Sequence, residues 1–229
     1  MKSKHITTSA LALAILLSIP ALIPTGSASS SQDDMALIIV STLFQDDVEE
    51  NKTISYHDHL TDQGYSADRI EFLAFNDTQL ADRISTIDNI ESAFGNIIND
   101  SNMNKQVAIY IADHEQGIRH NSSFTFIDGN ITANQIDIWL DGMRSSDLTV
   151  IMTGNRSGLA GYEIQDDDRS VISSMMRNQT VIPDHFNITR SLEDSSADTN
   201  QDGRVSYIEA YWKEVENLQE YDQDPCIWI

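Results

Sequence analysis

Short apolar stretches alternate with amphipathic stretches along most of the chain. Residues 35–40 form a continuous apolar run, which is typical of a strand buried on both faces of a sheet. In residues 86–98 the apolar positions recur at the spacing of one helix face. The predicted strands are 35–40, 69–75, 106–112, 148–153 and 170–175, and the predicted helices are 46–63, 86–98 and 133–143.

This alternation predicts an α/β fold in which a mainly parallel sheet carries helices on both faces. Ligands of such sheets bind at the carboxyl ends of the strands. The segments that follow the third and fourth predicted strands, 113–117 and 154–158, are therefore the first places to look for chemistry.

The first 28 residues have the features of an export signal. Two lysines precede an apolar run over residues 10–24, and Gly26-Ser27-Ala28 offers a cleavage site for a signal peptidase. A membrane anchor is the alternative, but it needs about 20 apolar residues. We expect a signal peptide over 1–28, a main α/β domain over 33–183 and C-terminal helices over 184–229.

Composition restricts the partners and the location. The net charge of −22 disfavours nucleic acid and anionic membranes, and we expect no stable membrane insertion after signal cleavage. Cys226 is the only cysteine, so an intramolecular disulfide is excluded, and a thiol on a terminal tail is a poor nucleophile. We expect a secreted or cell-envelope-exposed protein.

Acceptor motifs for N-glycosylation are more frequent than chance predicts. Roughly two or three Asn-x-Ser/Thr sequons would arise by chance at this composition. The chain has eight, at Asn51, Asn76, Asn99, Asn121, Asn130, Asn155, Asn178 and Asn187. Their abundance agrees with export and with glycosylation.

Two motifs at the predicted strand ends carry a family resemblance. Asp113-His114-Glu115 follows the third strand, and Gly154-Asn155-Arg156-Ser157-Gly158 follows the fourth. Their order and spacing resemble the legumain-like cysteine peptidases of the caspase fold, in which these strands end in His-Gly and Asp-Ala-Cys-x-Ser-Gly. The resemblance implies a caspase-like three-layer sandwich, with His114 at the catalytic histidine position and Asn155 at the nucleophile position.

The departures from the family pattern argue against peptide cleavage. An amide such as that of Asn155 is a very poor nucleophile, and loss of a nucleophile costs orders of magnitude in rate. Glu115 replaces the glycine whose amide would help to hold an oxyanion, and Thr153 replaces an aspartate. His114 could equally be a hydrogen-bonded surface residue, and Asn155 could serve a left-handed turn. Ser157 is a weak alternative nucleophile.

A twelve-residue segment near the C-terminus matches the EF-hand calcium loop. Predicted helices flank it at 184–192 and 207–218, and Gly203 stands at the sharp turn. The predicted ligands are Asp198, Asn200, Asp202, the carbonyl of Arg204, Ser206 and Glu209. The alternatives are a chance acidic turn, a magnesium site, an empty loop, or a separate EF-hand tail.

The calcium loop also fits the family resemblance. The segment 197–203 and the pair Glu209-Ala210 resemble an insertion found in some bacterial and archaeal legumain-like domains. The resemblance implies that calcium would fasten the last helices to the sheet as an EF-hand-like helix-loop-helix.

Together these observations predict an exported, calcium-binding pseudo-peptidase that binds a peptide or protein in the former substrate cleft, or serves structurally in the envelope. An active endopeptidase with another nucleophile and a calcium-dependent adhesion or assembly module are the two alternatives. Turnover of a peptide would favour the first alternative, and calcium-dependent self-association would favour the second.

Overall fold

A computed structural model describes residues 33–41, 47–76, 80–113, 116–118, 121–180 and 184–229. The predicted signal peptide, His114 and Glu115 lie outside these residues. Among the helices described, none is both long enough and apolar enough to span a membrane.

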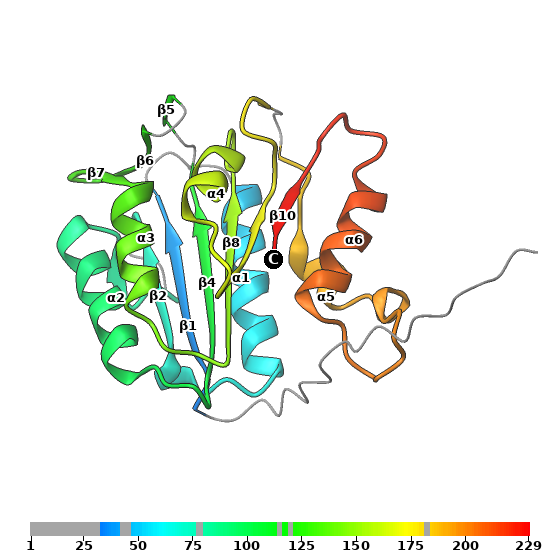
Figure 1. Cartoon of the computed structure of the whole chain (residues 1–229), viewed down its shortest axis with the longest axis horizontal. Helices are drawn as coiled ribbons and strands as arrows, with labels where there is room; N and C mark the ends of the chain where they lie inside the picture. The colour runs from blue at the N-terminus through cyan, green and yellow to red at the C-terminus, as the bar shows by residue number, and fades with distance from the viewer. Residues whose placement is uncertain (1–32, 42–46, 77–79, 114–115, 119–120, 181–183) are drawn as a thin grey trace, which may run out of the picture.

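The core of the protein is a seven-stranded sheet with the order β10-β9-β8-β4-β1-β2-β3 (Figure 1). Every neighbouring pair is parallel except β10 and β9, which are antiparallel. The strands are β1 (Met35–Val40), β2 (Ile70–Ala74), β3 (Arg83–Ile84), β4 (Gln106–Ala112), β8 (Asp147–Thr153), β9 (Ser170–Ser173) and β10 (Cys226–Trp228). The predicted mainly parallel α/β architecture is confirmed.

Within the described residues, six α-helices and two short 3-10 helices accompany the sheet. They are α1 (Asp47–Asp62), α2 (Ile87–Asp100), α3 (Ala133–Asp141), α4 (Gly158–Ile164), α5 (Ile188–Leu192), α6 (Tyr207–Asn217), η1 (Ala67–Arg69) and η2 (Ser195–Ala197). The side chain of Thr86 caps α2, and the side chain of Thr132 caps α3 by accepting from the Gln135 amide.

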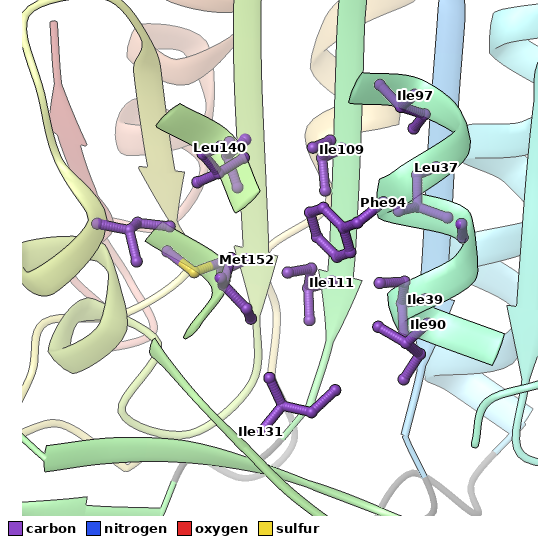
Figure 2. Packing of buried hydrophobic residues seen from close by; sticks show 14 of the residues in the cluster. Leu37, Ile39, Ile90, Phe94, Ile97, Ile109, Ile111, Ile131, Leu140 and Met152 are labelled. Carbon is purple, nitrogen blue, oxygen red and sulfur yellow. The ribbon is translucent and has the colours of Figure 1, made fainter. Parts of the chain in front are cut away.

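Helices α2, α3 and α4 cover one face of the sheet. Alternate strand residues point into this layer, such as Leu37 and Ile39 of β1, while their neighbours point to the other face. Figure 2 shows Phe94 of α2 reaching toward Ile109 and Ile111 of β4. Each such large side chain, fully buried, contributes about 1.5–3 kcal/mol of hydrophobic stabilisation.

Helices α1, α5 and α6 supply the core of the opposite face. Tyr56 of α1 stacks on Tyr110 of β4 with 4.8 Å between ring centroids, and its hydroxyl lies 2.7 Å from that of Tyr207 in α6. Phe186, Tyr211 and their apolar neighbours pack in the same cluster. The C-terminal segment therefore completes the three-layer sandwich and also adds the edge strand β10.

A small antiparallel sheet of three strands, β5 (Gln116–Ile118), β6 (Asn121–Phe126) and β7 (Gly129–Thr132), was absent from the prediction. It lies at the carboxyl end of the main sheet (Figure 1). Phe124, Phe126 and Ile131 are buried in the α2–α3 core. Phe124 and Phe126, on either side of Thr125, are the short alternation that could have revealed it.

The helix predicted over residues 184–192 is shorter in the structure. Asn187 has a non-helical backbone with a φ of −146° and a ψ of 87°, and its side chain accepts from the Arg190 amide, so α5 begins only at Ile188. Asp184 accepts from the Phe186 amide, which holds the preceding segment in a turn. The exiting helix α6 agrees with its prediction to within one residue.

Candidate functional site

The ends of β4 and β8 lie side by side, where the sequence places the two motifs. Ala112 pairs with Thr153 in the register of the two strands, and the Asp113 amide donates to the Thr153 carbonyl at 3.1 Å. Asn155 lies two residues after Thr153 and is half-buried. The structure therefore brings the turn that follows β8, residues 154–158 (the β8 turn), next to Asp113, which precedes His114. His114 itself lies outside the described residues.

Asp113 fastens three segments together at this edge. It is 1% exposed, and its Oδ1 accepts from Ser41 Oγ at 2.5 Å. Its Oδ2 accepts from the Thr125 amide at 2.7 Å. A buried carboxylate with hydrogen bonds to both oxygens is a positioning group, and it fixes β6 against the ends of β1 and β4.

The β8 turn, also called the elbow below, is a tight turn of the backbone. Gly154 and Arg156 have positive φ angles of 116° and 66°, so Asn155 lies between two residues in left-handed conformations. The Arg156 amide donates to the Gln179 carbonyl at 3.1 Å. A Cβ on Gly158 would lie 2.6 Å from the Arg177 nitrogen, so only glycine fits the close approach that follows the turn.

A buried polar network lies beneath the elbow. The Gly154 amide donates to Ser174 Oγ and to Asp184 Oδ2, both at 3.0 Å. Ser174 Oγ donates to the same Asp184 oxygen at 2.8 Å. Ser174 and Asp184 are 0% and 8% exposed, so these bonds form in a low-dielectric setting in which they hold the turn firmly.

The second oxygen of Asp184 ties this network to the C-terminal segment. It accepts from the Phe186 amide at 2.9 Å and from Gln223 Nε2 at 2.6 Å. Gln223 Nε2 also donates to the Ser174 carbonyl at 3.0 Å, and Lys52 Nζ donates to the Asp184 carbonyl at 2.6 Å. The sequence reasoning missed Asp184, Ser174 and Gln223, because no motif spacing links them.

Ser157 belongs to this network and does not face the surface. It is 1% exposed, and its Oγ accepts from the Met175 amide at 3.1 Å and lies 3.2 Å from Ser174 Oγ. A peptide carbonyl could not approach this oxygen without displacing the 174–175 segment. The geometry therefore disfavours Ser157 as a nucleophile.

Cys226 occupies a different place from the one expected of a terminal tail. It belongs to β10 and pairs with Ser173, so the thiol is held in the edge strand that lies two strands from β8. Burial raises the pKa of the Cys226 thiol, which outweighs the opposing hydrogen bond with Ser173. The nucleophilic thiolate is therefore disfavoured at neutral pH.

The predicted calcium loop lies between η2 and α6, at the opposite end of the molecule from the β8 turn (Figure 1). Gln201 and Gly203 have positive φ angles of 58° and 88°. Asp198 Oδ1 accepts from the Asp202 amide at 3.2 Å, and Asp198 Oδ2 accepts from the Gly203 amide at 3.0 Å. The backbone thus folds round the Asp198 carboxylate, with the sharp turn at Gly203 that a calcium loop requires.

Glu209 closes the loop through hydrogen bonds. Its Oε2 accepts from the amide and hydroxyl of Ser206 at 3.0 and 2.8 Å, which forms a capping box at the start of α6. Its Oε1 accepts from the amide and hydroxyl of Thr199, both at 2.9 Å, and from the Asn200 amide at 3.2 Å. Burial would raise the pKa of Glu209, but these hydrogen bonds lower it to about 2.

These residues fit calcium by the chemistry of their oxygen donors and by the loop backbone. Asp198, Asn200, Asp202 and Ser206 lie along the loop, and the Arg204 amide donates to Asp202 Oδ1 at 2.9 Å. Across the described part of the chain, no three His, Cys, Asp or Glu side chains gather closely enough to hold a metal. Binding would therefore require Glu209 to exchange some of its present hydrogen bonds for the ion.

Comparisons with known proteins show the fold and nothing finer. No family model matches the chain, and no curated protein matches it. Among solved structures, the Drosophila initiator caspase Dronc matches with a TM-score of 0.57 over 86% of this chain and 80% of that chain, at 11% sequence identity. The protein therefore has a caspase-like fold: a mainly parallel seven-stranded sheet flanked by helices.

Proposed function

We propose that this caspase-fold protein is an exported, non-catalytic relative of the legumain-like peptidases that binds a peptide or protein segment at the carboxyl ends of β4 and β8. The observation that carries the proposal is the half-buried Asn155 at the end of β8, where the family resemblance places a cysteine. An amide there cannot supply the thiolate that peptide cleavage requires.

The two other side chains that could replace the nucleophile are poorly suited to the task. The Ser157 hydroxyl is buried beneath the elbow and hydrogen-bonded there. The Cys226 thiol lies in the edge strand, and burial raises its pKa. Binding without turnover is therefore better supported than cleavage.

The rigid elbow favours binding as the retained function. Asp184 and Ser174 hold the Gly154 amide from below, and Asp113 holds the neighbouring strand end. A preorganised backbone loses less conformational entropy when a ligand docks, so the same scaffold can bind a peptide segment after its nucleophile is gone.

We further propose that the loop from Asp198 to Glu209 binds calcium and stabilises the C-terminal helices. The donor types, Gly203 at the turn and the capping of α6 by Ser206 support this assignment. A single loop with this position suits a structural role with a dissociation constant of about 10⁻⁴–10⁻³ M.

Cleavage of a diverse fluorogenic peptide library by the mature protein tests the lack of catalysis. We expect no turnover by the native protein with or without calcium. An Asn155→Cys variant that gains turnover would show that the remaining residues of the edge are still competent. Turnover by the native protein that a His114→Ala variant abolishes would contradict the proposal and favour an active peptidase.

A binding experiment tests the other half of the proposal. The same library, immobilised as unlabelled peptides, should retain the native protein on a restricted set of sequences. A Gly154→Val variant is the matched test of the site, because a β-branched residue cannot adopt the φ of 116° at that position. Equal retention of both proteins on every peptide would place binding elsewhere.

A further inference from the structure

Burial divides the eight glycosylation sequons into groups. Because the motif specifies both an asparagine and a hydroxyl residue two positions later, an enzyme that modifies the folded surface must reach both side chains. In three sequons the hydroxyl residue is inaccessible. Thr53, Ser157 and Thr189 are 0%, 1% and 2% exposed, and they belong to the sequons of Asn51, Asn155 and Asn187.

Three other sequons present both groups. The asparagines Asn121, Asn130 and Asn178 are all exposed. Their hydroxyl residues are the half-buried Ser123 and the exposed Thr132 and Thr180. Asn121 begins β6, Asn130 lies in β7 beside the β6–β7 turn, and Asn178 lies in the segment after β9, so each is next to a turn or loop.

The two remaining sequons, those of Asn99 and Asn76, belong to neither group. Asn99 and Asp100 lie in the last turn of α2, and the sequon ends at the C-cap Ser101, whose amide donates to the Ile97 carbonyl, so the tripeptide begins inside a helix. The hydroxyl residue of the Asn76 sequon lies outside the described residues.

We propose that Asn121, Asn130 and Asn178 are N-glycosylation sites of the folded protein, and that Asn51, Asn155 and Asn187 stay unmodified. The donor would be a lipid-phosphate- or lipid-pyrophosphate-linked oligosaccharide. The amide nitrogen of asparagine forms a bond to the sugar C1, the bond from C1 to the phosphate oxygen breaks, and the amide loses one proton. The proposal requires export but does not depend on peptide binding.

The surface around these sites is suited to a glycan cover. Ile127 is 52% exposed and lies in the turn before Asn130, and Met176 is 49% exposed two residues before Asn178. Isolated apolar side chains of this kind are shielded when a bulky hydrophilic group is attached beside them. β6, β7 and the segment after β9 all lie at the carboxyl end of the sheet (Figure 1). The glycans would therefore flank the β8 turn, while Asn155 within it stays bare.

Site-resolved glycopeptide mass spectrometry of the protein secreted by cells with N-glycosylation machinery tests the proposal. We expect glycans at Asn121, Asn130 and Asn178. Each single Asn→Gln variant at these positions should lose the mass of one glycan, whereas Asn155→Gln should leave the intact mass of the glycans unchanged. A secreted protein without glycans at Asn121, Asn130 and Asn178 would overturn the proposal.

Modification in vitro separates the effect of folding from that of local sequence. The folded protein and short synthetic peptides spanning Asn155 and Asn187 would be incubated with membranes that hold the transferase and its lipid-linked donor. Peptides that are modified, beside a folded protein that is bare at the same positions, would confirm selection by burial. Equal modification of folded protein and peptides, or peptides that are not modified at all, would contradict it.

Discussion

At the scale of single residues, Asp184 is the side chain on which the arrangement of the β8 turn depends most. Its two oxygens accept from four donors: the amides of Gly154 and Phe186, Ser174 Oγ and Gln223 Nε2. A carboxylate is the only side-chain group of this size that accepts at both terminal atoms. An amide in its place would direct an NH₂ group at two other donors.

We therefore expect Asp184→Asn to lower the free energy of unfolding by about 2–5 kcal/mol, since each buried donor left unsatisfied costs about 1–3 kcal/mol. Urea unfolding at pH 7 measures the change. Asp100→Asn is the matched control, because Asp100 is 57% exposed and forms a surface ion pair with Arg69 at 2.9 Å. A loss no larger than that of the control would show that the network does not stabilise the fold.

A second residue-scale prediction concerns Gly158, the first residue of α4. A Cβ there would lie 2.6 Å from both the Arg177 nitrogen and the Met175 carbonyl oxygen, which are backbone atoms that cannot easily move away. We expect Gly158→Ala to destabilise the protein by about 1–3 kcal/mol through overpacking. The same substitution at Gly95, where a Cβ meets nothing within 4 Å, should be neutral or stabilising. Thermal melting of both variants would compare them directly.

At the scale of elements, the start of α6 depends on the ionisation of Glu209. Hydrogen bonds that outweigh burial lower the pKa of Glu209 from 4.5 to about 2. The folded state therefore binds this proton less readily than the unfolded state. The stabilisation is complete above pH 4.5 and is lost as the pH falls from 4.5 toward 2.

In calcium-free buffer, the difference in unfolding free energy between the native protein and Glu209→Gln should therefore shrink as the pH is lowered through this range. Urea unfolding at a series of pH values measures it. The difference isolates Glu209, because the other carboxyl groups are common to both proteins. A difference that stays constant between pH 6 and pH 3 would contradict the depressed pKa.

The elements themselves differ in how well the sequence predicts them. Strands β1, β4 and β8 were predicted to within one residue, because each is a nearly continuous apolar run in the centre of a parallel sheet. The three-residue strands β5 and β10 carry too few residues for a recognisable period, and β10 is a strand only because it pairs with β9. Short edge elements are decided by their partners, which local sequence does not contain.

The sequence also predicts one part of the candidate site and not another. The position of Asn155 beside the end of β4 followed from the order of strands and their two motifs. The hydrogen-bond network that holds the β8 turn did not follow from the sequence. Its residues Ser174, Asp184 and Gln223 come from separate segments up to 49 residues apart. These side chains come together only when the C-terminal segment packs against the sheet, so their spacing in the sequence could not indicate the network.

At the scale of the whole molecule, the proposed calcium loop and the β8 turn lie at opposite ends of the molecule, and α6 begins at the proposed calcium loop (Figure 1). After α6 the chain reaches Gln223, which binds Asp184 beneath the turn. Lys213 of α6 contacts Asp194, and the buried Glu214 pairs with Arg190 of α5 through hydrogen bonds of 2.8 and 2.9 Å. Ordering the start of α6 would therefore also order a segment that packs with α5 and contributes Ala210, Tyr211 and Leu218 to the core cluster on one face of the sheet.

A test of calcium binding must separate the ion in the loop from general screening of the charge. With a net charge of −22, any salt reduces repulsion within the folded protein and raises its stability. At 10 mM calcium, a site with a dissociation constant of about 10⁻⁴–10⁻³ M adds about 1.4–2.7 kcal/mol. We expect calcium to raise the melting temperature more than sodium chloride of equal ionic strength does.

The part of the rise in melting temperature by which calcium exceeds sodium chloride should depend on the carboxylate of Glu209. Glu209→Gln should remove most of the gain over sodium chloride, because it takes away a bidentate ligand. Glu216→Gln should keep the gain, since Glu216 is 69% exposed on the same helix and its carboxylate lies 3.7 Å from Lys213 Nζ, away from the loop. If calcium and sodium chloride raise the melting temperature equally, the loop is not a calcium site, and the hydrogen bonds of Glu209 hold the start of α6 without the ion.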